Sequence, residues 1–458
     1  MKRSHLTALG LISFLVISPS RLDARVETYT YASFVPVSSV YSVEAGEQSQ
    51  TVFVTSEPEV CAFGCDDRTT VTVRFASVRV DSLAVRPLSI DFDQVWDRAA
   101  QVLTLKMSPR QRAVVEINGD TDKPLFLFAN PIDEDKPSPD DKNVIFFKAG
   151  CVRNIRDLNL RPGQTLYLEG GAWLRGNLRL EGTRDVHVRG AGVIDGRVAS
   201  GVPMRITECH DVSVGGIIML NDFGHTTRVY GSDHLTFDNY KVVATRNPHN
   251  PKGLENDALN LISCSHASVY HCFSYAHDDT FCIKTTEDGP AEDISYYDCI
   301  AWHVMGGNSF EIGYETTSDI RDISYKKIYS LHARGNETLV RSADLGIHHA
   351  SRGTIENISY EDVYLEESDE WTLAMMMFQN PYSKKDYAVN YRPGHIRGVT
   401  LKNIHVLYPI RFGSLIEGYD EDHRVEGLVI DGLYVLGRRV TSSGEALISA
   451  GHADVIWK

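Results

Sequence analysis

The clearest pattern along the chain is a short strand motif that returns many times after residue 145. Each unit alternates apolar and polar positions, and the interval between units varies from 23 residues (Val212 to Leu235) to 41 (Ile358 to Val399). Alternation with a period of two is typical of a β-strand with one buried face. The units are Asp185-Val-His-Val, Asp211-Val-Ser-Val, His234-Leu-Thr-Phe, Ala267-Ser-Val-Tyr, Asp293-Ile-Ser-Tyr, Asp322-Ile-Ser-Tyr, Asn357-Ile-Ser-Tyr, Gly398-Val-Thr-Leu and Gly427-Leu-Val-Ile.

A variable interval with a constant strand motif is typical of a solenoid. No single unit can bury its apolar side alone, whereas stacked units share one core and let insertions bulge out as loops. The strands are not separated by helix-length apolar runs, which argues against a helical solenoid or a TIM barrel. We therefore predict an all-β protein with a right-handed parallel β-helix over residues 145–458.

Residues 25–130 show a different pattern. Short β-branched and aromatic runs, for example at 70–75, 113–117 and 124–128, are broken by Gly, Asp and Pro, which predicts an N-terminal antiparallel β-sandwich. Residues 131–144 are polar and rich in proline, so we interpret them as a linker. We expect the sandwich to cover an end of the solenoid, since an exposed end invites pairing with other chains.

The composition narrows the classes of partner. The chain has 458 residues, 42% of them hydrophobic, and a formal net charge of −15. A protein this negative is a poor candidate for binding nucleic acid or an anionic membrane surface. A polyanionic substrate is slightly disfavoured as well.

Residues 1–24 have the layout of a secretory signal peptide. A basic start is followed by the apolar run from Leu6 to Ser18, then by Pro19 and the small residue Ala24. We therefore expect a secreted protein, or a periplasmic one in a bacterium. Eight cysteines are compatible with an oxidising compartment: Cys61 and Cys65 could close a tight loop, whereas Cys264, Cys272, Cys282 and Cys299 are expected to be small buried residues of the core.

Two carboxylate motifs stand about one coil apart. Asp257 precedes Asp278 and Asp279 by 21 and 22 residues, and each motif leads into an apolar strand. If both strands belong to one sheet, the side chains stack about 4.8 Å apart, and their repulsion makes one of them hold its proton to higher pH. Inverting hydrolysis of a glycosidic bond uses a protonated carboxyl and an ionised one about 6.5–9.5 Å apart, with a water between.

Adjacent residues of a regular strand face opposite ways, so Asp278 and Asp279 can act together only if the chain bends just before Thr280. The alternative is that Asn-Asp and Asp-Asp are ordinary turn residues at the corners of coils. The spacing of the motifs and the apolar strand after each favour a catalytic group.

The neighbouring coils offer candidate substrate-binding residues. The stretch Gly306-Gly-Asn-Ser-Phe-Glu-Ile-Gly places Asn308 at the corresponding strand start, and its two glycines would let the backbone approach a ligand. Asn308 could equally belong to an asparagine ladder that satisfies backbone groups. The other candidates are the polar residues Lys284, Glu311 and Arg341 and the sugar-stacking aromatics Trp302, Tyr314 and Tyr275, although a lone aromatic in a coil is more often core.

Gly190-Ala-Gly-Val-Ile-Asp-Gly, Asn256-Asp257, Asp278-Asp279 and the Gly-Asn-Ser-Phe-Glu-Ile-Gly stretch resemble the β-helical hydrolases of the polygalacturonase (family 28) and dextranase–isopullulanase (family 49) clan. Family 49 resembles the chain more closely, through Lys284, through Asn308 where polygalacturonases have a histidine, and through the N-terminal sandwich. This resemblance implies an inverting hydrolase of α-glucans with no metal or cofactor, in which Asp278 is the acid and Asp257 and Asp279 position and deprotonate the water.

The sequence also departs from these families. Ala258 follows Asp257 where a glycine is usual, and Thr280-Phe281 includes one extra residue relative to family 49. The uronate clamp Arg-Ile-Lys of polygalacturonases is replaced by Arg341-Ser-Ala. Galacturonan is therefore the less favoured substrate, although another galactan remains an alternative.

Two other functions remain compatible with the sequence. A β-helical polysaccharide lyase needs a basic residue as its base, a role that Lys284 could fill, and usually a calcium site. A non-catalytic carbohydrate-binding β-helix, such as an adhesin, needs neither.

Overall fold

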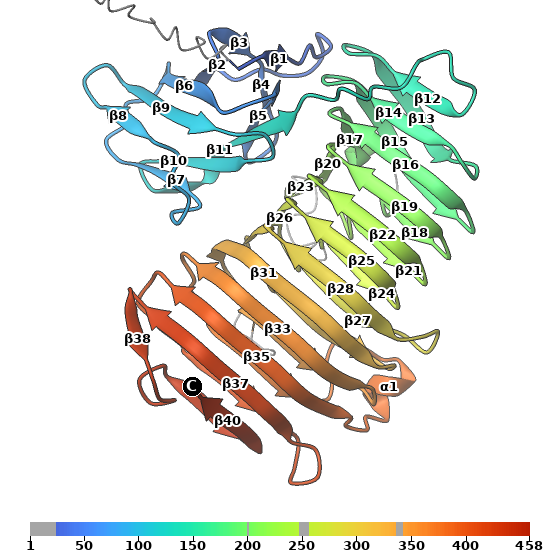
Figure 1. The fold of residues 1–458 in the computed structure, drawn as a ribbon, viewed down its shortest axis with the longest axis vertical. Helices are drawn as coiled ribbons and strands as arrows, with labels where there is room; N and C mark the ends of the chain where they lie inside the picture. The colour runs from blue at the N-terminus through green and yellow to red at the C-terminus, as the bar shows by residue number, and fades with distance from the viewer. Residues whose placement is uncertain (1–23, 199–200, 247–255, 336–341) are drawn as a thin grey trace, which may run out of the picture.

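The computed structural model describes residues 24–198, 201–246, 256–335 and 342–458, so the predicted signal peptide and Arg341 lie outside the described residues. From β12 (Val144–Phe147) onward, the chain forms a stack of coils in which almost all strand pairs are parallel. Figure 1 shows these coils stacked along the long axis of the molecule. The predicted parallel β-helix is confirmed.

Each coil contributes strands to three columns, and equivalent strands of successive coils pair in register. The first column contains the repeated motif: β12, β14 (Thr165–Leu168), β16 (Arg184–Gly190), β19 (His210–Gly215), β22 (Asp233–Asp238), β25 (Ser265–Tyr270), β28 (Ala291–Tyr297), the first parts of β31 (Ile320–Ala333), β33 (Thr354–Leu365), β35 (His395–Val406) and β37 (Val425–Val435), and β40 (Ala453–Trp457).

The other two columns complete each coil. The second contains the first parts of β13 (Val152–Asn159) and β15 (Trp173–Glu181), β17 (Val193–Asp195), β20 (Ile218–Asn221), β23 (Lys241–Ala244), β26 (Phe273–Ala276), β29 (Ile300–His303) and the later parts of β31, β33, β35 and β37. The third contains the later parts of β13 and β15, β18 (Met204–Thr207), β21 (Thr227–Tyr230), β24 (Leu259–Ile262), β27 (Phe281–Thr285), β30 (Phe310–Thr316), β32 (Ala343–His349), β34 (Trp371–Met377), β36 (Ser414–Glu417) and β39 (Ile448–Gly451).

A left-handed turn residue introduces each strand of the repeated motif. Asp185, Asp211, Asp293, Asp322 and Asn357 all have φ between 54° and 58°. Asp and Asn tolerate this conformation better than most side chains, and Gly398 and Gly427 occupy the same place in later coils. The polar residue that opens each unit is therefore what turns the chain into the next strand.

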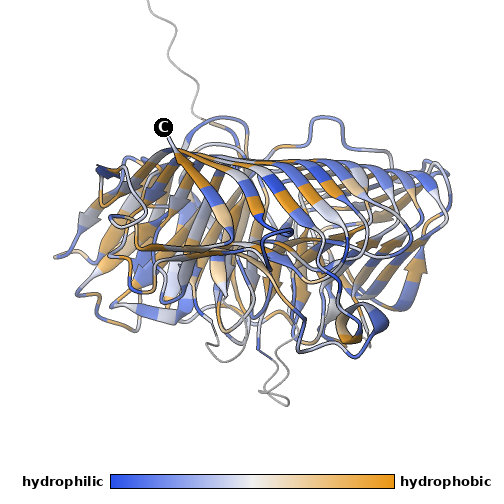
Figure 2. Ribbon diagram, turned by 90° about the horizontal axis from the view of Figure 1, so that it is seen from below, coloured by the Kyte–Doolittle hydropathy of each residue, from blue (hydrophilic) through white to orange (hydrophobic). Residues whose placement is uncertain are grey.

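One hydrophobic cluster runs through the helix, made of the inward side chains of all three columns. In the view along the axis, hydrophobic and hydrophilic residues alternate along the strands (Figure 2). The rings of Tyr296, Tyr325 and Tyr360 stack at 4.8 and 4.7 Å between centroids within this core. Cys264, Cys272 and Cys299 are fully buried there, as predicted. Cys282 is also buried but lies outside this cluster, and its thiol donates to the Gly313 carbonyl oxygen at 3.3 Å.

The N-terminal residues form two sheets around a second core. All pairs within them are antiparallel except β5 with β11, a departure from the expected pattern. One sheet contains β1 (Val26–Thr28), β4 (Val52–Val54), β5 (Glu59–Cys65), β7 (Leu83–Arg86), β10 (Arg112–Ile117) and β11 (Asp120–Pro131), and the other β2 (Tyr41–Ala45), β3 (Gln48–Gln50), β6 (Thr69–Phe75), β8 (Val95–Asp97) and β9 (Val102–Met107). Cys61 and Cys65 both lie on β5 as free thiols, so they do not form the loop-closing disulfide that the sequence left open.

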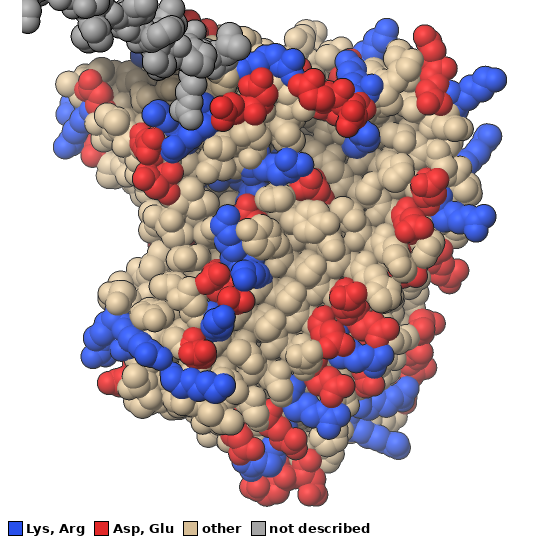
Figure 3. All heavy atoms as spheres, viewed as in Figure 1, with Lys and Arg blue, Asp and Glu red and all other residues tan. Residues whose placement is uncertain are grey.

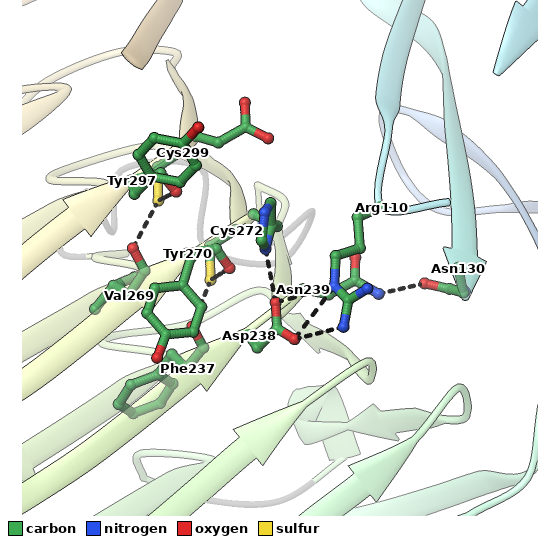
Figure 4. A network of polar contacts seen from close by, with 12 residues as sticks. Arg110, Asn130, Phe237, Asp238, Asn239, Val269, Tyr270, Cys272, Tyr297 and Cys299 are labelled. Atoms are coloured by element: carbon green, nitrogen blue, oxygen red, sulfur yellow. Dashed lines mark hydrogen bonds and ion pairs between the residues drawn. The ribbon is translucent and has the colours of Figure 1, made fainter. Parts of the chain in front are cut away.

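The N-terminal sheets lie against the flank of the helix instead of capping its end. Phe126 of β11 packs against Phe273, Tyr275 and Trp302, with ring centroids 4.8 to 6.0 Å apart. These residues belong to the outward face of the second column, so the N-terminal sheets bury an apolar flank that would otherwise face solvent. Figure 4 shows polar contacts of the same interface, where Arg110 meets Asp238 at 3.1 Å.

Helix is nearly absent from the described residues. Their only helical segments are the single turn α1 (Asp386–Val389) and the 3₁₀ turn η1 (Gly196–Val198). One short strand, β38 (Arg438–Val440), pairs antiparallel with β37 as a hairpin. None of the helices in the described residues is long and apolar enough to span a membrane.

Candidate active site

The three predicted aspartates meet where strands of the third column begin. The register of β24 with β27 places Asp257 beside Asp279, since the Ala258 amide donates to the Asp279 carbonyl oxygen at 2.9 Å. In the next coil the Thr280 amide donates to the Asn308 carbonyl oxygen at 3.0 Å. Residues separated by 22 and 29 positions (257 to 279 to 308) thus form one column at the strand starts.

A bend brings Asp278 onto the same side. The chain bends at residues 277, 278 and 280, between β26 and β27, as the sequence predicted. The Asp278 carboxylate accepts a hydrogen bond from the Asp279 amide at 2.9 Å. One carboxylate oxygen each of Asp257, Asp278 and Asp279 lies within 4.8 Å of the others.

This separation is shorter than the sequence-based expectation for an inverting pair, about 6.5–9.5 Å. Two acceptors about 4.6 Å apart are, however, within reach of one water that donates both its hydrogens at about 2.8 Å. Asp257 and Asp279 are 3% and 7% exposed, whereas Asp278 is partly open to solvent. The arrangement therefore fits two buried carboxylates that hold a water and a third carboxyl that a ligand can reach.

Asp257 is held as an anion. Its Oδ2 lies 2.9 Å from His225 Nδ1, 3.5 Å from Lys284 Nζ and 3.0 Å from Asn260 Nδ2. Burial opposes its ionisation, but the charges of His225 and Lys284 and these hydrogen bonds keep the pKa of Asp257 below its usual range.

Opposing effects act on the pKa of Asp279. Its Oδ1 accepts hydrogen bonds from the Asn308 backbone amide at 2.9 Å and from Asn308 Nδ2 at 3.1 Å. Burial raises the pKa of Asp279 to about 6 against the pull of Lys284, whose Nζ lies 3.8 Å from Oδ2. A carboxylate with such a pKa is a better proton acceptor near neutral pH than the strongly held Asp257.

Asp278 is the member of the group that holds its proton. Burial against its neighbours and the negative charges of Asp257 and Asp279 raise the pKa of Asp278 well above its usual range. The turn that carries Asn308 packs tightly on it, since a Cβ at Gly307 (φ +75°) would lie 2.4 Å from Asp278 Oδ1. Gly307 therefore allows the backbone to approach the aspartates, and not a ligand as the sequence suggested.

Lys284 is the cation of the site. Its Nζ contacts Asp257, Asp279 and Glu315, the last at 4.0 Å. Burial alone would lower the pKa of Lys284, but Cys282 and the surrounding carboxylates raise it well above its usual range. Lys284 is thus a charged partner of the aspartates and not a free base.

The other predicted substrate-binding residues are dispersed. Tyr314 is partly exposed beside Tyr382, with stacked rings 6.3 Å apart, so it stays a candidate. Glu311 is fully buried, and both its carboxylate oxygens lie 3.0 Å from His348 Nδ1. It therefore cannot contact a substrate and instead packs beneath the site. Trp302 and Tyr275 are each 1% exposed in the sandwich interface and have no face free for a sugar, so their predicted stacking role is wrong.

Sequence reasoning missed several residues that the fold brings to the aspartates. His225 stands one coil before Asp257 in the same column, and Asn260 lies on β24, three residues after Asp257. Glu315 is the outer partner of Lys284, and Tyr382 reaches Tyr314 from the loop after β34. A search for polar residues at each start of the third-column strands would have found His225.

No protein-family model matches the sequence, and no curated protein matches it. Among solved structures, Dex49A from Penicillium minioluteum is similar over 93% of this chain and 96% of that one, with a TM-score of 0.66 and 13% identity. A polygalacturonase from Erwinia carotovora ssp. carotovora covers 68% of this chain and 89% of its own, with a TM-score of 0.47 and 12% identity. A family 28 exopolygalacturonase from Yersinia enterocolitica covers 85% and 96%, with a TM-score of 0.45 and 11% identity. The likeness to Dex49A shows that this chain shares its fold, and the resemblance to β-helical polysaccharide hydrolases is confirmed at the level of the fold.

Proposed function

We propose that this protein is a glycoside hydrolase that cleaves α-glycosidic bonds of a polysaccharide with inversion. One observation carries the proposal: three carboxyl groups within 4.8 Å of one another differ sharply in their hold on a proton. Carboxyl groups whose environments push their pKa values apart are suited to separate acid and base roles.

The proposed reaction follows from these differences. Asp278, partly exposed and protonated, donates its proton to the bridging oxygen as the bond from that oxygen to the anomeric carbon breaks. A water held by Asp257 and Asp279 attacks that carbon from the other face and gives a proton to Asp279. Transfer of that proton to Asp278 through solvent restores the site, and the net change is the addition of one water.

Burial favours attack by water over attack by a carboxylate. Asp257 and Asp279 are 3% and 7% exposed and are fixed by their partners, so a water reaches them more readily than a sugar carbon does. The short distance between the oxygens nevertheless lies near that of retaining enzymes, about 5–5.5 Å between carboxyl groups. Proton NMR of the first product distinguishes attack by water from attack by a carboxylate. We expect the anomer opposite to the substrate linkage, and retention of configuration would contradict direct attack by water.

Charge supports a neutral substrate. Three carboxylates already compensate the positive charge of Lys284, so Lys284 is not available to bind the carboxylate of a uronate. A neutral α-glucan of the dextran or pullulan type is therefore our first choice, and a galactan the second. The same pairing disfavours a lyase, because a lysine held as a cation by three acids cannot accept a proton from the sugar.

Asp278→Asn is the direct test of the proposed acid. We expect hydrolysis of dextran or pullulan to fall by about 10²–10⁴-fold with an unchanged circular dichroism spectrum. Asp293→Asn, at an exposed turn in the same coil, should keep full activity. Full activity of Asp278→Asn would remove Asp278 from the role of acid, and glycan binding by the wild type without turnover would identify a binding protein instead.

We also propose that the protein is secreted. Support comes from the apolar run and small residue within positions 1–24 of the sequence. Amino-terminal sequencing of exported protein should find cleavage near Ala24.

A further inference from the structure

A group of histidine and aspartate side chains lies on the surface at the start of β19 and β22. The register of these strands makes His210 the neighbour of Asp233 and makes Asp211 the neighbour of His234. The two histidines therefore lie diagonally opposite each other across two neighbouring coils, and so do the two aspartates. Figure 1 shows β19 and β22 side by side on one face of the helix.

A single carboxylate orients both imidazole rings. Asp233 Oδ1 lies 2.7 Å from His210 Nδ1, and Asp233 Oδ2 lies 3.2 Å from His234 Nδ1. When Nδ1 donates its proton to Asp233, the lone pair of each ring is on Nε2. Histidines that ligate metal ions almost always donate their other ring N–H in this way, because the carboxylate fixes the tautomer and the orientation of the ring.

A third ligand stands next to these nitrogens. Asp211 Oδ2 lies 3.0 Å from His210 Nε2, and one ligand atom each of His210, Asp211 and His234 lies within 4.8 Å of the others. Tetrahedral zinc places its ligand atoms about 3.3 Å apart. The three side chains are about half exposed, at 48%, 56% and 52%, so they can close that difference by rotation and leave a fourth position to water.

We infer that His210, Asp211 and His234 form a binding site for a divalent transition-metal ion of the zinc type, oriented by Asp233. Two imidazoles and one carboxylate suit zinc better than calcium or magnesium, which prefer oxygen ligands. A bound ion would tie two successive coils together at their turns. The acidic group of the candidate active site is the other such cluster in the described part of the chain, but Lys284 already supplies its positive charge.

Titration calorimetry of the full chain with Zn²⁺ tests the inference. We expect one site that binds Zn²⁺ at least 100-fold more tightly than Ca²⁺. His234→Ala and His210→Ala should each weaken binding more than tenfold, and Asp233→Asn should weaken it about 10–100-fold because the rings lose their orientation. The exposed positions make these variants compatible with an unchanged circular dichroism spectrum.

Two variants serve as controls. His452→Ala removes an exposed histidine that also pairs with a carboxylate through Nδ1, and it should keep full zinc affinity. Asp278→Asn should also keep it. Unchanged binding in the His210→Ala/His234→Ala double variant, loss of binding in Asp278→Asn, or equal affinity for Ca²⁺ would each overturn the assignment. In a thermal melt, saturating Zn²⁺ should raise the Tm of the wild type and of His452→Ala but not that of the double variant.

Discussion

At the scale of single residues, three aspartates of identical chemistry receive different properties from their neighbours. Asp257 has His225, Asn260 and Lys284 around one oxygen, whereas Asp278 faces two carboxylates. Their protons are therefore shared within one coupled group, and a pH profile reports values of the group as a whole.

Activity should follow a bell-shaped curve with pH. The rising limb lies near pH 6, because the Asp279 carboxylate must lose its proton to accept one from water and burial raises the pKa of Asp279 to about 6. The falling limb lies higher, where Asp278 loses the proton that it must donate.

Lys284→Met tests the electrostatic part of this account. Lys284 lowers the pKa of Asp279 and Asp278, so its removal should move both limbs to higher pH, the rising limb by about one unit or more. Measuring kcat/KM against pH shows the shift. Lys284→Arg keeps the charge and should keep the limbs near their wild-type positions, while an unmoved rising limb in Lys284→Met would contradict the assignment.

At the scale of elements, the site depends on turns as well as on strand register. The turn between β29 and β30 passes so close to Asp278 and Asp279 that a Cβ at Gly307 would lie 2.3 Å from the Asp279 amide nitrogen. The adjacent Gly306 has room, since its Cβ would meet its nearest atom at 3.8 Å.

The two glycines make a matched pair of variants. Gly307→Ala adds a Cβ in a left-handed conformation and against backbone, so the bend at Asp278 has to shift; we expect at least a 100-fold loss of kcat, since displacements of about 1 Å cost that much, and a lower Tm. Gly306→Ala should retain most of both. Equal activity in the two variants, measured on the same glucan, would show that the close approach does not position the aspartates.

The sequence revealed those parts of the structure that depend on local pattern. The strand motif and the spacing of Asp257 from Asp279 were enough to predict the coils and the acidic group, because the coil between these two aspartates has no long insertion. Trp302 was misassigned because which face of β29 is covered depends on the sandwich, whose Phe126 lies far away in sequence. His225 was not predicted because 32 residues separate it from Asp257. With such an insertion in the coil, the sequence does not show which residues of the two strands lie side by side.

At the scale of the whole molecule, the N-terminal sheets and the helix form one body with mixed surface charge. Figure 3 shows acidic and basic side chains interspersed on one face, in spite of the net charge of −15. Part of this mixture is a set of ion pairs between coils, such as Lys326 and Lys402 with Glu361. Exposed pairs of this kind contribute little stability. The N-terminal sheets are held on the helix by the apolar contacts of Phe126 with β26 and β29 and by buried ion pairs such as that of Arg86 with Glu366 at 3.0 Å.

The N-terminal sheets also reach the candidate active site. Glu57, in the loop between β4 and β5, places Oε2 2.7 Å from His277 Nε2, and His277 directly precedes Asp278. The same oxygen accepts a hydrogen bond from the Arg246 amide at 2.8 Å. Burial opposes the charge of Glu57, but the hydrogen bond and charge of His277 lower the pKa of Glu57, so a carboxylate anchors the bend.

Glu57→Ala should therefore impair catalysis from outside the helix. Without its anchor the bend can move, and we expect kcat to fall about tenfold or more while KM changes little, since Glu57 does not touch the proposed sugar site. Glu57→Gln retains an acceptor and should recover part of the rate. Glu44→Ala, which removes an exposed carboxylate paired with Arg74 in the same sheets, should leave kcat unchanged. A wild-type kcat for Glu57→Ala would mean that the sandwich supports the helix without positioning its acid, and a raised KM with unchanged kcat would place Glu57 on the substrate path instead.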